Sequence, residues 1–196
     1  MDEIRDPSKE FSYGAGHINP VQAIDPGLVY DAREGDYIRF LCSIGIRGEQ
    51  MALIVGAKVM CPTNFSGSPK DLNYPSILST VAEASFLREV TNVGGATSTY
   101  KASVTTPPNL KIKITPEILH FKHLNEKMNF TITVSARKAK ENQIYSASLI
   151  WTDGIHKVRS PIVMYINRGA TQATYCSYFS YVVLLNFVIF YVISHI

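Results

Sequence analysis

The chain has little of several features that mark specialised classes of protein. Three cysteines in 196 residues are too few for a small protein held together by disulfides. A formal net charge of +3 is far from the concentrated positive charge of a nucleic-acid-binding surface. The amino end alternates charged residues and no apolar run follows, so nothing there resembles a signal peptide. With 46% hydrophobic and 11% aromatic residues, the chain can still bury a globular core.

Charge is missing from one end of the chain. Residues 169–196 contain no Asp, Glu, Lys or Arg, so every charged side chain lies in residues 1–168. Within this apolar tail, residues 175–196 would form a helix roughly 33 Å long, enough to cross a bilayer core. The tail is therefore either a transmembrane helix or translated non-coding sequence. We prefer the second interpretation because no Lys or Arg follows the apolar run to set its orientation.

Residues 11–60 have the pattern of short helices and turns. Asn19 followed by Pro20 is a typical helix start, with Asn as the cap and Pro in the first turn. The sequence Asp-Pro-Gly at 25–27 predicts a turn, and residues 28–30 predict a brief strand after it.

Two further helices are expected in the same part of the chain. Asp31 and Glu34 form a variant of the capping box ahead of apolar residues at helical spacing. Gly45 is placed to end this helix in a left-handed conformation. A second short helix is expected at about 49–55, ending at Gly56.

From residue 71 to 166 the hydrophobic period changes to two. Strands are expected at 86–93, 99–104, 110–114, 128–134, 145–151 and 158–165. Asp153 and Gly154 form a strong hairpin signal between the last two. Roughly seven short strands within about 100 residues describe an antiparallel β-sandwich of the immunoglobulin or fibronectin type III kind. The predicted fold class is mainly β, preceded by a short α-rich segment.

The sequence contains no catalytic constellation of its own. It has no nucleophile elbow G-x-S-x-G, and the glycines at 14–16 are only half of a phosphate-binding fingerprint. His120 and His123 on a strand edge would point to opposite faces, which disfavours a metal site. His17 and His156 are expected to be structural residues in turns. We therefore expect no catalytic residue, no cofactor and no metal.

Two sequons and two cysteines bear on the compartment. Asn64 and Asn129 each begin an N-x-S/T acceptor sequence, which matters only in a secretory protein. Cys42 and Cys61 could close a compact loop, and their pairing would imply an oxidising compartment. Two buried thiols in a cytosolic protein fit the same spacing equally well.

Six separated motifs follow one another in a characteristic order. They are F-S-Y-G-A-G-H-I-N-P at 11–20, D-P-G-L-V-Y-D at 25–31, D-Y-I-R-F-L-C at 36–42, D-L-N-Y-P-S at 71–76, R-E-V-T-N-V-G at 88–94 and V-R-S-P-I-V at 158–163. In this order they resemble plant subtilisin-like serine proteases (subtilases) of the cucumisin type, over about residues 11–166. So many motifs in one order make convergence implausible.

The resemblance implies a domain organisation and a set of sites. The chain would consist of four parts: the carboxy-terminal remnant of a peptidase domain at 1–60, a linker at 61–70, a fibronectin type III-like sandwich at 71–167 and the apolar tail at 168–196. The family's catalytic Asp, His and Ser and its oxyanion-hole Asn match no residue here, so the chain is expected to be inactive alone. The resemblance also implies a disulfide between Cys42 and Cys61 and a glycosylated protein with sugars at Asn64 and Asn129.

Partners and location follow from the same resemblance. The partners would be the missing peptidase domain in cis and protein or peptide substrates of the full-length enzyme, and no nucleic acid is expected. The location would be the extracellular space or apoplast. A membrane partner is expected only if residues 175–196 are a real helix. The alternative is a non-catalytic β-sandwich interaction module, either without a membrane anchor or anchored in a membrane by its tail. We further expect residues 71–166 to fold alone and residues 1–60 to be poorly ordered, because their apolar surface would lack its partner.

Overall fold

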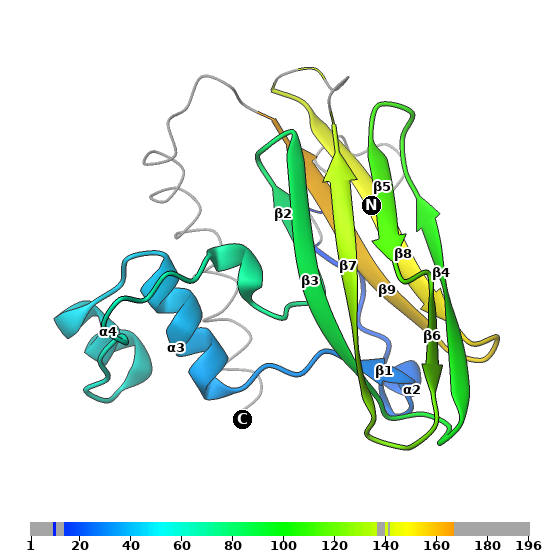
Figure 1. Cartoon of the computed structure of the whole chain (residues 1–196), viewed down its shortest axis with the longest axis horizontal. Coiled ribbons are helices and arrows are strands. Elements are labelled where there is room, and N and C mark those ends of the chain that lie inside the picture. The colour runs from blue at the N-terminus through cyan, green and yellow to red at the C-terminus, as the bar shows by residue number, and fades with distance from the viewer. Residues whose placement is uncertain (1–9, 11–13, 137–139, 141, 167–196) are drawn as a thin grey trace. The chain divides into compact units, whose positions relative to one another are not determined.

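The computed structural model describes residues 10, 14–136, 140 and 142–166 (Figure 1). These residues fall into two compact units. The first contains the described residues up to Tyr37 together with those from Lys70 to Ile166, and the second contains Ile38–Pro69. The apolar tail lies outside the described residues, so both interpretations of residues 175–196 stay predictions. Within the described ranges, no helix is both long and apolar enough to cross a bilayer.

The first unit is a sandwich of two β-sheets. Its strands are β1 (Leu28–Val29), β2 (Ile77–Ser79), β3 (Glu83–Asn92), β4 (Ser98–Thr105), β5 (Lys111–Thr115), β6 (Ile118–Phe121), β7 (Lys127–Ser135), β8 (Ile144–Thr152) and β9 (Lys157–Tyr165). One sheet has the order β1-β3-β7-β5 and the other β2-β9-β8-β4-β6. β2 pairs with β9 in parallel, and the other neighbouring strands are antiparallel. The prediction of a mainly β chain with a sandwich of this kind is confirmed.

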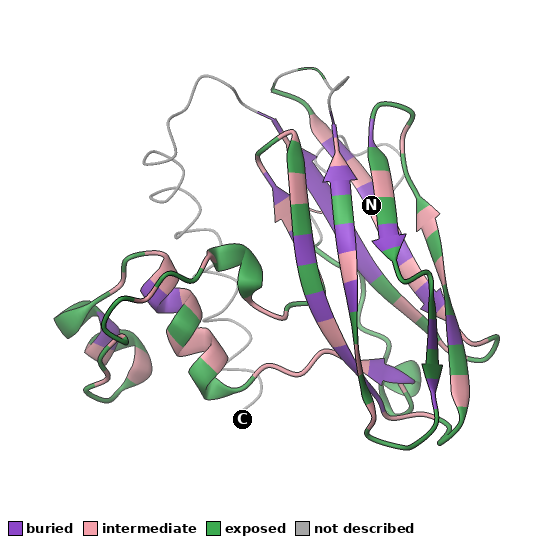
Figure 2. Cartoon of the chain, viewed as in Figure 1, coloured by how far each residue is buried: buried purple, intermediate pink, exposed green. Residues whose placement is uncertain are grey.

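Buried and exposed residues alternate along the strands of both sheets (Figure 2), and the buried ones form the core between the sheets. Along β8, every second residue from Tyr145 to Trp151 is buried, which is the period-two pattern read from the sequence. Trp151 is fully buried and packs edge-to-face on Phe130, with the ring centroids 5.1 Å apart. Aromatic pairs in this arrangement add stability beyond the area they bury.

Part of the sandwich lies before residue 71. β1 pairs with β3, with Leu28 opposite Asn92 and Val29 opposite Thr91. The Leu28 side chain is only 2% exposed and belongs to the sandwich core. The structure therefore divides the chain differently from the domain boundaries expected from the resemblance. The first unit includes β1 besides residues 71–166, and the Leu28 side chain fills part of its core. That residues 71–166 fold alone stays a prediction.

The described residues 14–60 form regular elements instead of the poorly ordered region expected from the sequence. Besides β1, they contain α2 (Pro20–Ala23), α3 (Glu34–Ser43) and α4 (Gly48–Val55). The start of α2 is as predicted: the Asn19 side chain accepts a hydrogen bond from the Gln22 N–H at 3.3 Å. The 3-10 helix η1 (Pro69–Asp71) leads toward the strands of the sandwich.

The second unit has a small core of its own. Leu41, Cys42 and Met51 are buried there, and a disulfide joins Cys42 to Cys61. Gly45 follows α3 with a φ of 88°, so the predicted left-handed residue after this helix is confirmed.

The predicted capping box at the start of α3 is wrong. The Asp36 carboxylate, and not Glu34, accepts a hydrogen bond from the backbone N–H of Arg33 at 2.8 Å. Asp31 does not cap the helix, because its carboxylate binds Lys127 at 2.8 Å and accepts a hydrogen bond from Thr91 at 2.6 Å. A contact with the sandwich has displaced the local cap.

Candidate functional site

The two sequon asparagines are accessible. Asn64 is exposed in the second unit and has a φ of 64°. Asn129 is exposed on β7, opposite Glu89 of β3. Both positions could accept a glycan, and their modification stays a prediction.

The histidines of the β6 region are also exposed. The Nδ1 atom of His120 lies 3.0 Å from the Thr99 hydroxyl, and His123 lies in the turn beyond β6. His17 is exposed before α2. Among the described residues, no group of three or more His, Cys, Asp or Glu side chains could hold a metal ion.

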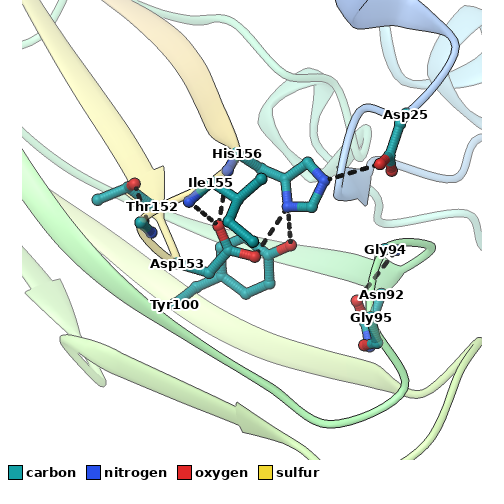
Figure 3. Close-up of polar contacts among 10 residues, drawn as sticks. Asp25, Asn92, Gly94, Gly95, Tyr100, Thr152, Asp153, Ile155 and His156 are labelled. Carbon is teal, nitrogen blue, oxygen red and sulfur yellow. Dashed lines mark hydrogen bonds and ion pairs between the residues drawn. The ribbon is translucent and has the colours of Figure 1, made fainter.

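His156 is the histidine that the fold encloses. The β8–β9 hairpin turns at Asp153, whose Oδ1 atom accepts hydrogen bonds from the backbone N–H groups of Ile155 at 2.9 Å and His156 at 2.7 Å. Asp commonly folds turns in this way, by bonding its own backbone two or three residues on. The turn directs the His156 side chain back toward the sandwich, where it is 11% exposed (Figure 3).

Each ring nitrogen of His156 faces a carboxylate. Nδ1 lies 2.8 Å from Oδ2 of Asp153, and Nε2 lies 3.1 Å from Oδ2 of Asp25. The first contact is a hydrogen bond, whereas the second is an ion pair that is not a hydrogen bond. Asp25 comes from the turn before β1, so the pair joins two segments that are distant in sequence (Figure 3).

Close packing around the ring requires glycine at position 27. Gly27 has a φ of 77°, and a Cβ atom there would lie 2.7 Å from both Cγ of His156 and the Tyr100 hydroxyl. Contacts this short leave no room for a side chain, so the glycine of the D-P-G sequence serves packing as well as turn conformation. Gly94 also lies against the ring, where a Cβ would be 3.2 Å from Cε1 of His156 and would need its neighbours to move slightly.

The same contacts shift the protonation of the cluster. Burial raises the pKa of Asp153, but hydrogen bonds from the His156 ring and from two backbone N–H groups outweigh it and lower the pKa to about 2. The hydrogen bond to Asp153 and the contact of Nε2 with the Asp25 carboxylate raise the pKa of His156. Burial, reinforced by the charge of Asp153, raises the pKa of Tyr100. The contacts of the cluster thus favour the protonated form of the ring.

A second charged cluster lies on the outer face of the β1-β3-β7-β5 sheet. Lys127 on β7 binds both Asp31 at 2.8 Å and Glu89 at 2.9 Å. These residues line a shallow depression of about 260 Å³, together with Arg33, Asp36, Asp71, Asn73, Leu87, Arg88 and Asn129. The Lys127 hydrogen bond lowers the pKa of Asp31.

Neither cluster is arranged for nucleophilic catalysis. A general base needs a ring nitrogen free to take a proton from a nucleophile. Both nitrogens of His156 are occupied by carboxylates, so this ring cannot play that role. The second cluster holds no histidine, serine or cysteine among the residues of its depression. Both clusters instead fix the segment around β1 to the sandwich.

Sequence reasoning missed this joining role. It placed His156 at the edge of the hairpin and Asp25 in a turn, and both positions are correct. Nothing in their spacing indicates that they meet. The only signals were the two Asp-containing turns themselves, each of which places a carboxylate near a chain reversal.

Comparison with known proteins places these features in a family context. The fibronectin type-III domain family matches residues 71–164. Subtilisin-like protease SBT4.6 of Arabidopsis thaliana is 46% identical over 174 residues, which cover 84% of this chain and 24% of the relative. SBT4.3 and SBT4.12, also subtilisin-like proteases of that plant, are 44% and 42% identical over 171 and 167 residues. The chain spans about a quarter of the length of these relatives.

Proposed function

Because this chain is a homologue of plant subtilisin-like serine proteases over 84% of its length, we propose that it is the carboxy-terminal part of a secreted endopeptidase of that family. The family resemblance read from its motifs is confirmed by identities of 42–46%. The matching stretch takes in both the segment before the sandwich and the sandwich itself. The proposed whole enzyme would cleave protein or peptide substrates through a peptidase domain in cis.

Exposed apolar side chains carry this proposal. In the first unit, Ile18, Val21 and Ile24 are between 80% and 89% exposed, all within seven residues. In the second unit, Leu53 and Met60 are exposed to a similar degree. Side chains of this kind, gathered in a short stretch, favour association with another surface. A peptidase domain in cis is the partner that the longer homologues supply.

The chain itself is proposed to contribute support and no catalytic group. In the family, a Ser nucleophile, a His base and an Asp form the triad, and an Asn stabilises the oxyanion. None of these matches a residue here, and each ring nitrogen of His156, the enclosed histidine among the described residues, faces a carboxylate. A polypeptide of these residues alone would therefore not cleave peptides.

Secretion and glycosylation are proposed on two observations. The structure joins Cys42 to Cys61, a bond that persists in oxidising compartments. Asn64 and Asn129 are both exposed acceptor positions. Expression in a secretory plant host, with a glycosidase-sensitive mass shift lost in Asn64→Gln and Asn129→Gln, would test this.

A serine-directed probe tests the enzymatic part. A fluorophosphonate would be applied to the 196-residue chain and to a chimera in which residues 11–166 replace the matching part of SBT4.6. We expect labelling and casein cleavage by the chimera and neither by the chain alone. The matched control is the chimera with its nucleophilic serine changed to alanine. Labelling of the chain itself, or a secreted and folded chimera that is never labelled, would contradict the proposal.

The exposed surface gives a second test. Val21→Asp should reduce secretion of the chimera, because it places a charge where the peptidase domain is proposed to pack. The same change should leave the yield of the 196-residue chain unchanged, because Val21 is exposed there. Equal effects in both proteins would contradict the proposed partner.

A further inference from the structure

The protonated ring of His156 suits both of its neighbours. A neutral imidazole has one N–H, and a carboxylate can only accept hydrogen bonds. The hydrogen bond to Asp153 uses that N–H at Nδ1, 2.8 Å from the carboxylate, so a neutral ring would turn its Nε2 lone pair toward the Asp25 carboxylate 3.1 Å away. A protonated ring is attracted to both carboxylates. We propose that His156 is a cationic latch that holds residues 25–31 on the sandwich and loosens its hold when the ring loses its proton.

The latch would act on a defined segment. Residues 25–31, here called the β1 segment, run from Asp25 through β1. The Gly27 carbonyl accepts hydrogen bonds from the backbone N–H groups of Val93 at 2.9 Å and Gly94 at 3.1 Å. Leu28 then enters the core. Release at the Asp25 end would first open the two hydrogen bonds at Gly27.

The two ends of the β1 segment respond differently to pH. At its far end, Asp31 pairs with Lys127, and these interactions lower the pKa of the acid and raise that of the base. That pair therefore keeps its charges throughout the neutral range. His156 is the group whose ordinary pKa of 6.5 lies near neutrality. Only the Asp25 end is thus built to change between slightly acidic and alkaline solution.

The groups that face the ring are few. They are Asp153 on the hairpin, Asp25 on the β1 segment and the buried hydroxyl of Tyr100 on β4, which lies 3.5 Å from Nδ1. Gly27 and Gly94 pack against the ring. Loss of the proton therefore replaces the attraction between Nε2 and Asp25, whose side chain is 68% exposed, with an unfavourable contact.

The sign of the pH dependence follows from these contacts. The pKa of His156 is raised, so its stabilisation is complete below 6.5 and is lost as the pH rises through the raised value. The pKa of Asp153 is lowered, so its stabilisation is complete above 3.8 and is lost as the pH falls toward about 2. The latch is closed between these limits. It depends only on the first unit, and does not rest on the proposed peptidase function.

Amide exchange and ring titration test the latch in the whole chain. In the wild type, ¹⁵N spectra should show both ring nitrogens of His156 protonated at pH 6 and titrating above 6.5. The protection factors of the Val93 and Gly94 amides should fall by up to about tenfold per pH unit above that titration, the limit for one linked proton. Asp25→Asn should lower the pKa of the His156 ring and reduce the protection of the Val93 and Gly94 amides at pH 6.

Two variants make the test decisive. In His156→Gln, the protection factors of the Val93 and Gly94 amides should no longer change with pH in the range where the wild-type ring titrates. His120→Gln is the matched control, because His120 is exposed and contacts Thr99; it should behave like the wild type. A ring of His156 that carries one proton at pH 6, or equal pH slopes in the wild type and His156→Gln, would overturn the proposal. If His156→Gln does not fold, the ring titration of the wild type and Asp25→Asn decides.

Discussion

The clearest test of how the β1 segment joins the sandwich is Leu28→Ala. Leu28 is nearly fully buried and lies in the core with Phe130 and Trp151. The substitution removes about three carbons at roughly 0.8 kcal/mol each and leaves a cavity, so we expect a loss of about 3 kcal/mol. Domains of this size are stable by about 5–15 kcal/mol, so the loss would be a large part of the total.

The assay is urea unfolding followed by tryptophan fluorescence. Trp151 is the only tryptophan in the chain and is fully buried, so its emission reports on the sandwich core. If the free energy of unfolding falls by about 1.5 kcal/mol per molar urea, the urea concentration at the midpoint of unfolding should fall by about 2 M. Ile24→Ala is the matched control, because Ile24 lies four residues earlier and is exposed; its midpoint should move by less than about 0.3 M. Equal midpoints for the two variants would refute the assignment of β1 to the sandwich core.

Three further outcomes are expected from single substitutions. Gly27→Ala should lower the free energy of unfolding by about 3 kcal/mol, because its new Cβ meets the His156 ring and the backbone has a positive φ. In the control Gly154→Ala the new Cβ meets nothing within 4 Å, so the loss in the same urea assay should be only about 1 kcal/mol. Tyr30→Phe should cost about 1 kcal/mol, because it removes the hydroxyl contact with Ser160 at 2.8 Å. Cys61→Ser should destabilise the second unit by about 3 kcal/mol, because it opens a loop with a sequence separation of 19; limited proteolysis within residues 38–69 would show this.

Each of these outcomes has its own refutation. Equal costs for the two glycine substitutions would show that the contact with the ring is not close. If the Tyr30→Phe variant is as stable as the wild type, the hydrogen bond between Tyr30 and Ser160 is worth no more than the hydration of the tyrosine hydroxyl in the unfolded chain. If the reduced wild type resists protease as well as the oxidised protein, the disulfide does not stabilise the second unit.

Local sequence pattern was sufficient for most of the fold. The alternation at 128–134 and 145–151 gave β7 and β8 to within one residue at each end. The predicted helix at 49–55 is α4, and Gly56 ends it with a φ of 74°. These elements follow from side-chain periodicity and from conformations that glycine favours, both of which are visible in a short window.

Contacts between distant residues could not be read in the same way. β1 has only two residues, and its partner β3 lies more than fifty residues further on. Asp31 occupied a convincing cap position, yet it pairs with Lys127 because the sandwich brings a stronger partner within reach. The ion pair of Asp25 with His156 likewise depends on the completed fold. Family motifs marked both segments as belonging to one protein without showing that they touch.

The pairing of β1 with β3 also limits how this sandwich can be moved between proteins. A sandwich cut at residue 71, where the family match begins, would leave the β3 edge at Thr91 and Asn92 open and the Leu28 site empty. Open edges recruit strands from other chains, so such a piece would tend to exchange or borrow a β1 segment from a neighbouring copy. Recombination that preserves a folded sandwich must therefore carry the β1 segment with it. The unit to be moved is longer than residues 71–164, which the family model matches.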